Sequence, residues 1–338
     1  MDKIQLNAHA KINLSLEITG KRPDGYHEIV SLMQGTGLHD IIEIRRRSVQ
    51  SDVPEISGVL INGRTVYLTS NADTIPTDMG NLALKAVKAL ADACGSDWAD
   101  EASTCTRTGD DGTDCCEGGP GIDAGSLLIN IDKRLPVAAG IAGGSGNAAA
   151  CLLGVNELLG RPFTLRELMD IGAGIGADVP FSVFMNAHRN REVLAGLGGI
   201  EEAADAAMTS GIGDIVVPVE SIPAHIILAN PGVGVSTREA YEAMDAIGYT
   251  DPASGVPHLF ANDMERFTLE KEAKAAELKK FMIDRLGADR VLMSGSGPTM
   301  VAYYQDKDEG RALRGMEIMS ELTSRDDSIR AWLTDTGR

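Results

Sequence analysis

Hydrophobic and polar residues alternate strictly near the start of the chain. Every even position from Ile4 to Ile18 is apolar, and every odd position between them is polar. Because side chains two positions apart in a strand share one face, this pattern predicts a β-strand with one buried face. Lys11 and Asn13 then lie together on the opposite face, which in an isolated strand is exposed to solvent.

Apolar spacing and capping residues predict the remaining elements. Strands are expected at 41–45, 59–61, 127–131, 215–219, 226–229, 291–294, 300–304 and 329–333. Helices are expected at 81–93 and 148–159, after the capping box of Thr164 and Glu167, after Ser236, and at 269–286 and 309–322. Strands and helices mix without regular alternation, which favours an α+β fold over a doubly wound sheet.

Length and charge narrow the class of protein. A chain of 338 residues suggests two domains, and a net charge of -18 argues against a general nucleic-acid binder, which needs clustered Lys and Arg. Residues 96–125 carry eight acidic side chains against the single basic Arg107, with almost no large aliphatic residues. We expect this segment to be a surface insertion in the first domain, since it lacks the apolar surface that orders a chain.

Cellular location and redox state follow from what the sequence lacks. The first residues show neither the basic nor the apolar stretch of a signal peptide, so we expect a cytoplasmic protein. Five cysteines without a CxxC pair predict reduced thiols and no zinc site. Residues 135–156 are uncharged over the length of a membrane span, but their proline, glycines and asparagines argue against contact with a membrane.

A glycine-rich run, PVAAGIAGGSGNAAA at 136–150, lies between a predicted strand and a predicted helix. Glycines let a ligand approach the backbone closely, and free N–H groups at a helix N-terminus favour an anion. An isolated run of this kind is also typical of a flexible loop, but the flanking Lys133 and Arg134 favour a phosphate site. There is no GxxxxGK[ST] motif, and Gly172-x-Gly174-x-x-Ala177 follows a helix rather than a strand, which argues against a dinucleotide fold.

Asp178 stands after these glycines and before Val179-Pro180. Because proline favours extended backbone before it, we expect Asp178 in a loop rather than inside a helix. A single loop Asp is usually a cap or a turn residue, so a catalytic role depends on its neighbours.

Six segments resemble, in order, the GHMP kinase superfamily. They are 10–34 (AKINLSLEITGKRPDGYHEIVSLMQ), 132–150 (DKRLPVAAGIAGGSGNAAA), 176–181 (GADVPF), 230–237 (NPGVGVST), 261–265 (ANDME) and 294–302 (SGSGPTMVA). The DGYHE element and the 132–150 loop are most similar to the branch that phosphorylates the 2-hydroxyl of a cytidine diphosphate derivative of methylerythritol, in the non-mevalonate isoprenoid pathway.

The resemblance implies an architecture of two domains. Residues 1–190 correspond to an ATP-binding domain like ribosomal S5 domain 2, interrupted by the 96–125 insertion, and residues 191–338 to a ferredoxin-like substrate domain. ATP and Mg²⁺ are the implied cofactors, and the partner is a small cytidine diphosphate substrate. We expect a monomer or a weak homodimer.

The resemblance also implies the roles of individual residues. Lys11 and Asp178 correspond to the catalytic pair, and Tyr26, His27 and Thr237 to the substrate site. Asn13 and Tyr241 are further candidates for that site. We expect Tyr26 and Tyr241 on either side of the cytosine ring and His27 at its edge. The ATP loop corresponds to Pro136, Val137, Ala138, Ala139, Gly140, Ile141, Ala142, Gly143, Gly144, Ser145 and Gly146, and Ser145 is the candidate metal ligand.

Two positions depart from the superfamily's usual GLGGGSS loop. Ala142 replaces a glycine, and Gly146 replaces the second serine. If backbone N–H groups hold the phosphates, Gly146→Ser is expected to be tolerated. Two alternatives remain: another GHMP kinase acting on homoserine, mevalonate or a sugar, against which DGYHE argues, and a non-catalytic nucleotide-binding protein, against which Lys11 and Asp178 argue.

Overall fold

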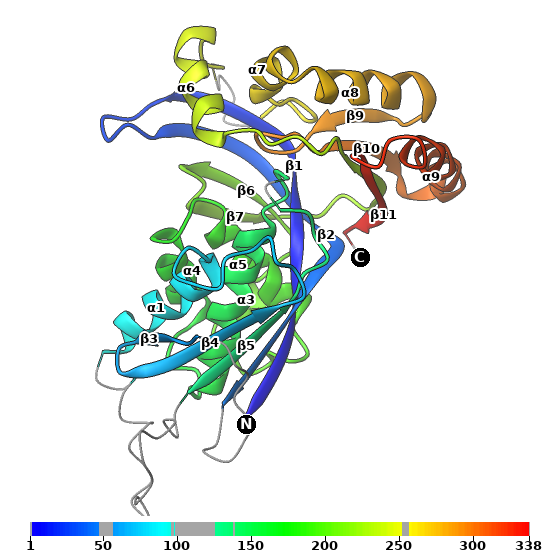
Figure 1. The fold of residues 1–338 in the computed structure, drawn as a ribbon. Coiled ribbons are helices and arrows are strands. Elements are labelled where there is room, and N and C mark those ends of the chain that lie inside the picture. The colour runs from blue at the N-terminus through cyan, green and yellow to red at the C-terminus, as the bar shows by residue number, and fades with distance from the viewer. Residues whose placement is uncertain are drawn as a thin grey trace, which may run out of the picture.

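The computed structural model describes residues 2–46, 57–95, 98, 126–137, 139–251 and 257–337. Two long antiparallel strands, β1 (Lys3–Lys21) and β2 (His27–Arg46), run the length of the molecule (Figure 1). The turn that joins them has Gly25 at φ +90°, a conformation that glycine adopts without strain. The strand predicted from residues 4–18 is confirmed, and it reaches both ends of the fold.

The other strands assemble around β2. The described residues form a sheet of eleven strands in the order β3-β4-β5-β2-β11-β8-β10-β9, with β1 and β6 also paired to β2, and β7 paired to β6. The strands are β3 (Val59–Ile61), β4 (Arg64–Ser70), β5 (Leu127–Asp132), β6 (Ala206–Gly211), β7 (Ile215–Val219), β8 (Ala224–Asn230), β9 (Arg290–Met293), β10 (Met300–Gln305) and β11 (Arg330–Thr336).

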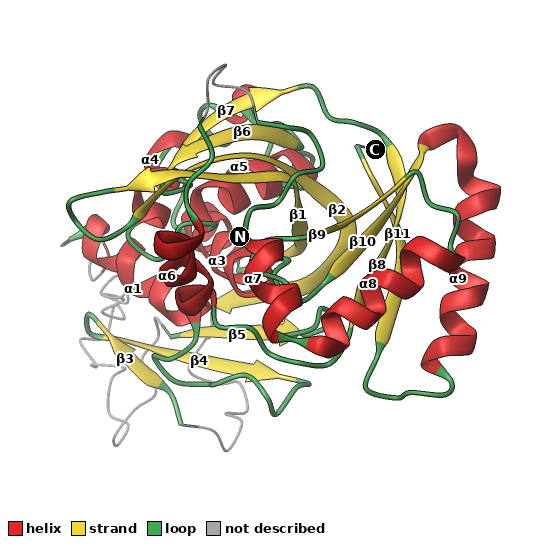
Figure 2. Ribbon diagram, turned by 90° about the horizontal axis from the view of Figure 1, so that it is seen from above, coloured by secondary structure: helices red, strands yellow, loops and turns green. Residues whose placement is uncertain are grey.

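The helices form two groups, one beside the lower half of the sheet and one beside the upper half (Figures 1 and 2). The first group is α1 (Leu82–Cys94), α3 (Gly143–Leu158), α4 (Leu165–Ala173) and α5 (Val179–Arg189). The second is α6 (Thr237–Ile247), α7 (Met264–Lys271), α8 (Ala273–Arg285) and α9 (Glu309–Thr323). The α+β content predicted from the sequence is therefore confirmed.

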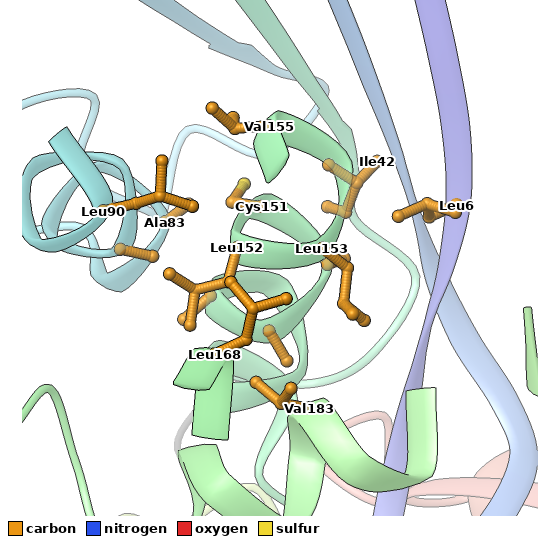
Figure 3. Packing of buried hydrophobic residues seen from close by; sticks show 14 of the residues in the cluster. Leu6, Ile42, Ala83, Leu90, Cys151, Leu152, Leu153, Val155, Leu168 and Val183 are labelled. Atoms are coloured by element: carbon orange, nitrogen blue, oxygen red, sulfur yellow. The ribbon is translucent and has the colours of Figure 1, made fainter. Parts of the chain in front are cut away.

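Helix α3 lies at the centre of the first group, and from Gly146 to Leu158 it is buried on all sides. Figure 3 shows its Cys151, Leu152, Leu153 and Val155 among side chains from α1, α4, α5, β1 and β2. A helix that is apolar all round belongs in a protein core, which explains the uncharged run at 135–156. None of the helices in the described ranges is long and apolar enough to cross a membrane.

Several elements differ from those that the sequence predicts. The single helix expected at 269–286 is wrong: α7 and α8 are separate helices, because Glu272 adopts extended backbone (φ -113°, ψ 92°) between them. The prediction also missed β4 and β6. Strand β4 begins with the charged but buried Arg64, and β6 consists largely of small residues, so neither shows a clear apolar alternation.

The prediction of a solvent-exposed polar face on β1 is wrong. His9, Lys11, Asn13, Ser15 and Glu17 are all buried. Other parts of the chain cover this face: the His9 N–H donates to Asn186 Oδ1 of α5 at 2.8 Å, and Glu17 Oε1 accepts the His258 N–H at 2.8 Å. The second face of β1 is therefore the inner wall of a site.

The predicted insertion at 96–125 lies outside the described residues except at Trp98. That side chain is buried, its Nε1 donates to Ile61 O at 3.1 Å, and the Arg64 guanidinium lies 4.6 Å from its ring centroid. The expectation that nothing in the segment packs on the body is therefore wrong at Trp98, because one indole supplies the apolar surface that the aliphatic residues do not.

Candidate active site

A cavity of about 510 Å³ opens where β1, the glycine-rich loop, α5 and α6 meet. Its lining includes Lys11 and Asn13 from β1, Ser145 from α3, Asp178 before α5, and Tyr241 from α6. Residues that are far apart in the sequence thus converge on one space, and several of them carry groups able to bind or move a proton.

Lys11 and Asp178 form an ion pair at the wall of this cavity. Lys11 Nζ lies 3.3 Å from Asp178 Oδ1 and donates to Asn13 Oδ1 at 2.7 Å. The Asn13 amide in turn donates to Ser31 Oγ at 2.8 Å, so both its ends are fixed. The register of β1 and β2 shifts on both sides of this pair, between His9 and Lys11 and again after Asn13. Such shifts redirect backbone groups, and the N–H of Lys11 bonds Ile141 O at 3.1 Å.

Asp178 occupies the position immediately before α5. Its own backbone angles are helical (φ -84°, ψ -8°), but it lies in the turn before the helix, so the expectation of a residue outside a helix is confirmed. The stated reason is wrong, because Val179, the residue that precedes Pro180, already belongs to α5 and is not extended. Pro180 lies in the first turn of α5, where backbone N–H groups have no partner within the helix, so its missing N–H costs no hydrogen bond. The Asp178 side chain does not cap its own helix, which leaves the carboxylate to face Lys11.

The glycine-rich loop is shorter than the sequence suggests, because α3 already begins at Gly143. Gly140 (φ +72°) is required sterically: a Cβ there would lie 2.5 Å from Ser294 O. Ser294 Oγ also donates to Gly140 O at 3.0 Å and accepts the Asn13 N–H at 3.2 Å. The loop is thus held against both β1 and the segment after β9.

Most of the predicted loop residues line the cavity. They are Pro136, Val137, Ala139, Gly140, Ala142, Gly143, Gly144 and Ser145. Ile141 and Gly146 do not line it, since Ile141 is buried in the core and Gly146 packs on the His9 carbonyl. Ala138 lies outside the described residues.

Asp40 is a residue of this site that sequence reasoning missed. Its fully buried carboxylate accepts Lys133 Nζ at 2.6 Å and the N–H groups of Arg134 and Leu135 at 2.7 and 2.8 Å. It thereby fixes the chain that leads into the loop and holds Lys133 at the cavity wall. Arg134 points away from the cavity, toward Asp132. Nothing in the sequence around Asp40 marks it, because its partners lie far along the chain, in the loop that follows β5.

Asn147 was also missed, although it directly follows the predicted loop. It lies in the first turns of α3, is buried, and lines the cavity. Its Oδ1 has no hydrogen-bond partner among the described residues. An unmade bond at a buried amide costs free energy, so Asn147 is a candidate site residue.

The α6 side of the cavity carries Thr237 and Tyr241. Thr237 Oγ1 lies 2.8 Å from Ser296 Oγ, and the Tyr241 ring stacks on His27 with centroids 5.2 Å apart. Burial, together with the nearby Asp178 charge, raises the pKa of Tyr241. His27 stands behind Tyr241 and does not line the cavity, and Tyr26 is 61% exposed outside it. The structure therefore places His27, rather than Tyr26, against the Tyr241 ring.

The fold is that of the GHMP kinases. A family model of the GHMP kinases N terminal domain matches residues 81–186. A crystal structure of 4-(cytidine 5'-diphospho)-2C-methyl-D-erythritol kinase matches 99% of this chain and 100% of its own, with a TM-score of 0.67 at 23% identity. The homoserine kinase from Cytophaga hutchinsonii matches 99% of this chain and 95% of its own, with a TM-score of 0.54 at 14% identity.

Sequence relatives narrow the class. The 4-diphosphocytidyl-2-C-methyl-D-erythritol kinase of Geobacter sp. (strain M21) is 34% identical over 92% of this chain and 93% of its own. The kinase of the same name from Alkaliphilus metalliredigens (strain QYMF) is 31% identical over 98% of both chains. The chain belongs to the 4-diphosphocytidyl-2-C-methyl-D-erythritol kinase family.

Proposed function

We propose that this chain transfers the terminal phosphoryl group of ATP to the 2-hydroxyl of 4-(cytidine 5'-diphospho)-2-C-methyl-D-erythritol, in the non-mevalonate route to isoprenoids. The observation that carries the proposal is the Lys11–Asp178 pair, which faces the same cavity as the glycine-rich loop and the N-terminus of α3. An acceptor hydroxyl and a nucleotide bound in this one space would meet beside both groups.

Lys11 and Asp178 are the proposed catalytic residues. Phosphoryl transfer depends on positioning and on neutralising charge more than on covalent steps. The Asp178 carboxylate would orient the acceptor hydroxyl and accept its proton as the oxygen attacks. The Lys11 ammonium, buried and held by Asn13, would offset negative charge on the transferring group.

The loop from Pro136 to Gly146 is the proposed ATP-phosphate site. Its support is the exposed N-terminus of α3, where N–H groups and the helix dipole favour an anion. Lys133 also lies at the cavity wall, where its ammonium, paired with Asp40, would add a hydrogen-bond donor rather than a net positive charge. Ile141 and Gly146 would then act through the shape of the loop rather than by contact.

Mg²⁺ is the proposed second cofactor, and the oxygens of the cavity fit it. Ser145, Asn147 and Asp178 present hydroxyl, amide and carboxylate oxygens, and the Asn147 oxygen has no protein partner among the described residues. Within that same part of the chain, no three His, Cys, Asp or Glu side chains form a metal site. The oxygens of Ser145, Asn147 and Asp178 suit Mg²⁺, because this ion keeps several water ligands and binds largely through substrate phosphates. When bound, the ion would neutralise phosphate charge.

The substrate is proposed to lie between β1 and α6, in contact with Asn13, Thr237 and Tyr241. Tyr26 and His27 are proposed as further substrate residues from the DGYHE element. His27 backs the Tyr241 ring, so an aromatic surface is available for a pyrimidine to stack on.

We also propose that residues 1–190 and 191–338 form two domains, of the ribosomal S5 domain 2 and ferredoxin-like types. Two groups of buried apolar residues support a division: one surrounds α1, α3, α4 and α5, and the other lies under α6 to α9. The first group extends to Val216 on β7. Limited proteolysis would locate the boundary, either near residue 190 or after β7.

An ADP-release assay with three acceptors tests the proposed reaction. The cytidyl substrate should support turnover, while mevalonate and homoserine, the acceptors of the alternative GHMP activities, should not. The matched control is Asp170→Asn, an exposed acid on α4, against Asp178→Asn. If none of the three acceptors supports turnover, in a folded protein that still binds ATP, the non-catalytic alternative would be favoured.

A further inference from the structure

The carboxylate of Asp245, on α6, collects donors from three places in the fold. Lys21 Nζ at the end of β1 contacts Oδ2. His27 Nε2, at the start of β2, lies 2.8 Å from Oδ1, and the Tyr249 hydroxyl donates to the same oxygen at 2.7 Å. These contacts join the β1–β2 turn to α6, two elements separated widely in sequence.

The position of Asp245 within α6 does not stabilise the helix. It lies in the last turn of the helix, close to Ile247, where the helix dipole disfavours a negative charge. Helix α6 also buries only Ala240 and Met244, so apolar packing alone fixes it weakly. The carboxylate is therefore explained by its tertiary contacts rather than by helix stability.

The hydrogen bonds from Lys21, Tyr249 and His27 hold the pKa of Asp245 below its ordinary value. An ionised carboxylate has no proton to donate, so His27 Nε2 carries the hydrogen of their bond. That fixes one orientation of the imidazole ring. The ring then stacks on Tyr241 at an interplanar angle of 21°, while Tyr249 meets its edge at 61°.

We propose that Asp245 is a positioning residue for the substrate end of the cavity, acting through His27 to hold the Tyr241 ring in place as an aromatic surface for the base of the ligand. The proposal rests on the proposed function, because it assigns the α6 side of the cavity to the pyrimidine. Asp245 itself does not line the cavity, so its effect on the ligand passes through the two rings.

Asp245→Asn tests this, since it keeps the shape of the side chain and removes the charge. The KM for the cytidyl substrate should rise about tenfold, the effect of one weakened charge-assisted bond, while kcat and the KM for ATP stay within about twofold. The matched control is Glu242→Gln, on the same helix, which pairs outward with Arg238 and should change neither KM. Equal rises in both KM values would overturn the proposal.

A double-mutant cycle separates positioning from a general loss of stability. If Asp245 acts through His27, Asp245→Asn should add nothing to the rise in KM that His27→Gln causes. Additive rises would overturn the proposal.

A third measurement needs no turnover. Imidazole ¹⁵N spectra of the full chain without substrate should show His27 protonated at Nε2, and the Nε2 signal should shift in Asp245→Asn but not in Glu242→Gln. An unchanged signal would overturn the positioning role even if the chain phosphorylates the cytidyl substrate. A shifted signal in a chain that does not phosphorylate it would instead refute the proposed function.

Discussion

Lys11 and Asp178 form an ion pair in which the two side chains differ in exposure: that of Lys11 is 3% exposed and that of Asp178 is 37%. The ammonium is therefore fixed and largely removed from water, while the carboxylate keeps an open side toward the cavity. A buried charge acts more strongly on its surroundings than an exposed one. The pair thus presents the cavity with one fixed cation and one accessible carboxylate.

Removing either member of the pair should reduce catalysis more than binding. We expect Asp178→Asn and Lys11→Ala to lower kcat by about 10²- to 10⁴-fold, the range for a lost proton acceptor or charge stabiliser. The KM for ATP should change by less than about threefold, because the loop and α3 provide the nucleotide contacts. ADP-release kinetics measure both quantities. Near-normal turnover in either folded variant would remove the proposed mechanism.

Restoring the superfamily's residues at positions 142 and 146 should have opposite effects on the stability of the fold. Ala142 adopts left-handed backbone (φ 55°, ψ 32°), which strains an L-residue, so Ala142→Gly should raise stability by about 1 kcal/mol. Gly146→Ser should lower it, because a Cβ there would lie 2.9 Å from His9 O, so the expectation of tolerance from the sequence is reversed. Urea denaturation of the two variants distinguishes these signs. A stabilising Gly146→Ser would show that α3 can move away from β1.

Asn147→Ala should weaken ATP binding without weakening the fold. Its Oδ1 has no partner among the described residues, so its removal breaks no known bond at that oxygen. An amide oxygen cannot bond directly to a phosphate oxygen, since both are acceptors. Its effect would pass through the proposed Mg²⁺ or its waters, and the KM for ATP should rise by about fivefold, as for one lost hydrogen bond. Asn156→Ala is the control on the same helix. The Asn156 amide is fully bonded, donating to Phe163 O at 2.9 Å and accepting the Phe163 N–H at 3.0 Å. That variant should lose stability and keep its ATP affinity; the reverse pattern would contradict the assignment.

His9 should make the fold sensitive to mild acid. Burial lowers its pKa from 6.5 to about 4, against the opposing effect of its bond to Thr36 O. Between these values the unfolded chain binds a proton that the native chain does not, so stability falls as pH drops from 6.5 to 4. The contribution is at most about 3 kcal/mol. In His9→Gln the loss over this range should be smaller, as urea midpoints at pH 7, 5.5 and 4 would show. Identical pH profiles would mean that His9 is protonated in the native state.

The sequence predicts best what neighbouring residues determine. The capping box of Thr164 and Glu167 is confirmed, with both reciprocal bonds present, because all its atoms lie within one helical turn. Asp40 and Asp245 could not be found in this way. Each carboxylate is held by hydrogen-bond donors that lie far away in the sequence. An isolated Asp in a strand or a helix has no local pattern that would reveal such donors. The buried polar face of β1 was mispredicted for the same reason, since alternation shows which face is apolar but not whether the other face is covered.

Ser294 supports both the glycine-rich loop, through Gly140, and β1, through Asn13. This places a condition on the order in which the site is completed during synthesis. Lys11 leaves the ribosome early and Asp178 midway, but the support for the loop arrives only with the segment after β9. A premature stop between residues 178 and 294 would yield a chain that keeps both proposed catalytic residues without the support of the loop proposed to hold the nucleotide. Nascent chains of this protein should therefore be unable to consume ATP until nearly all of the sequence has been made.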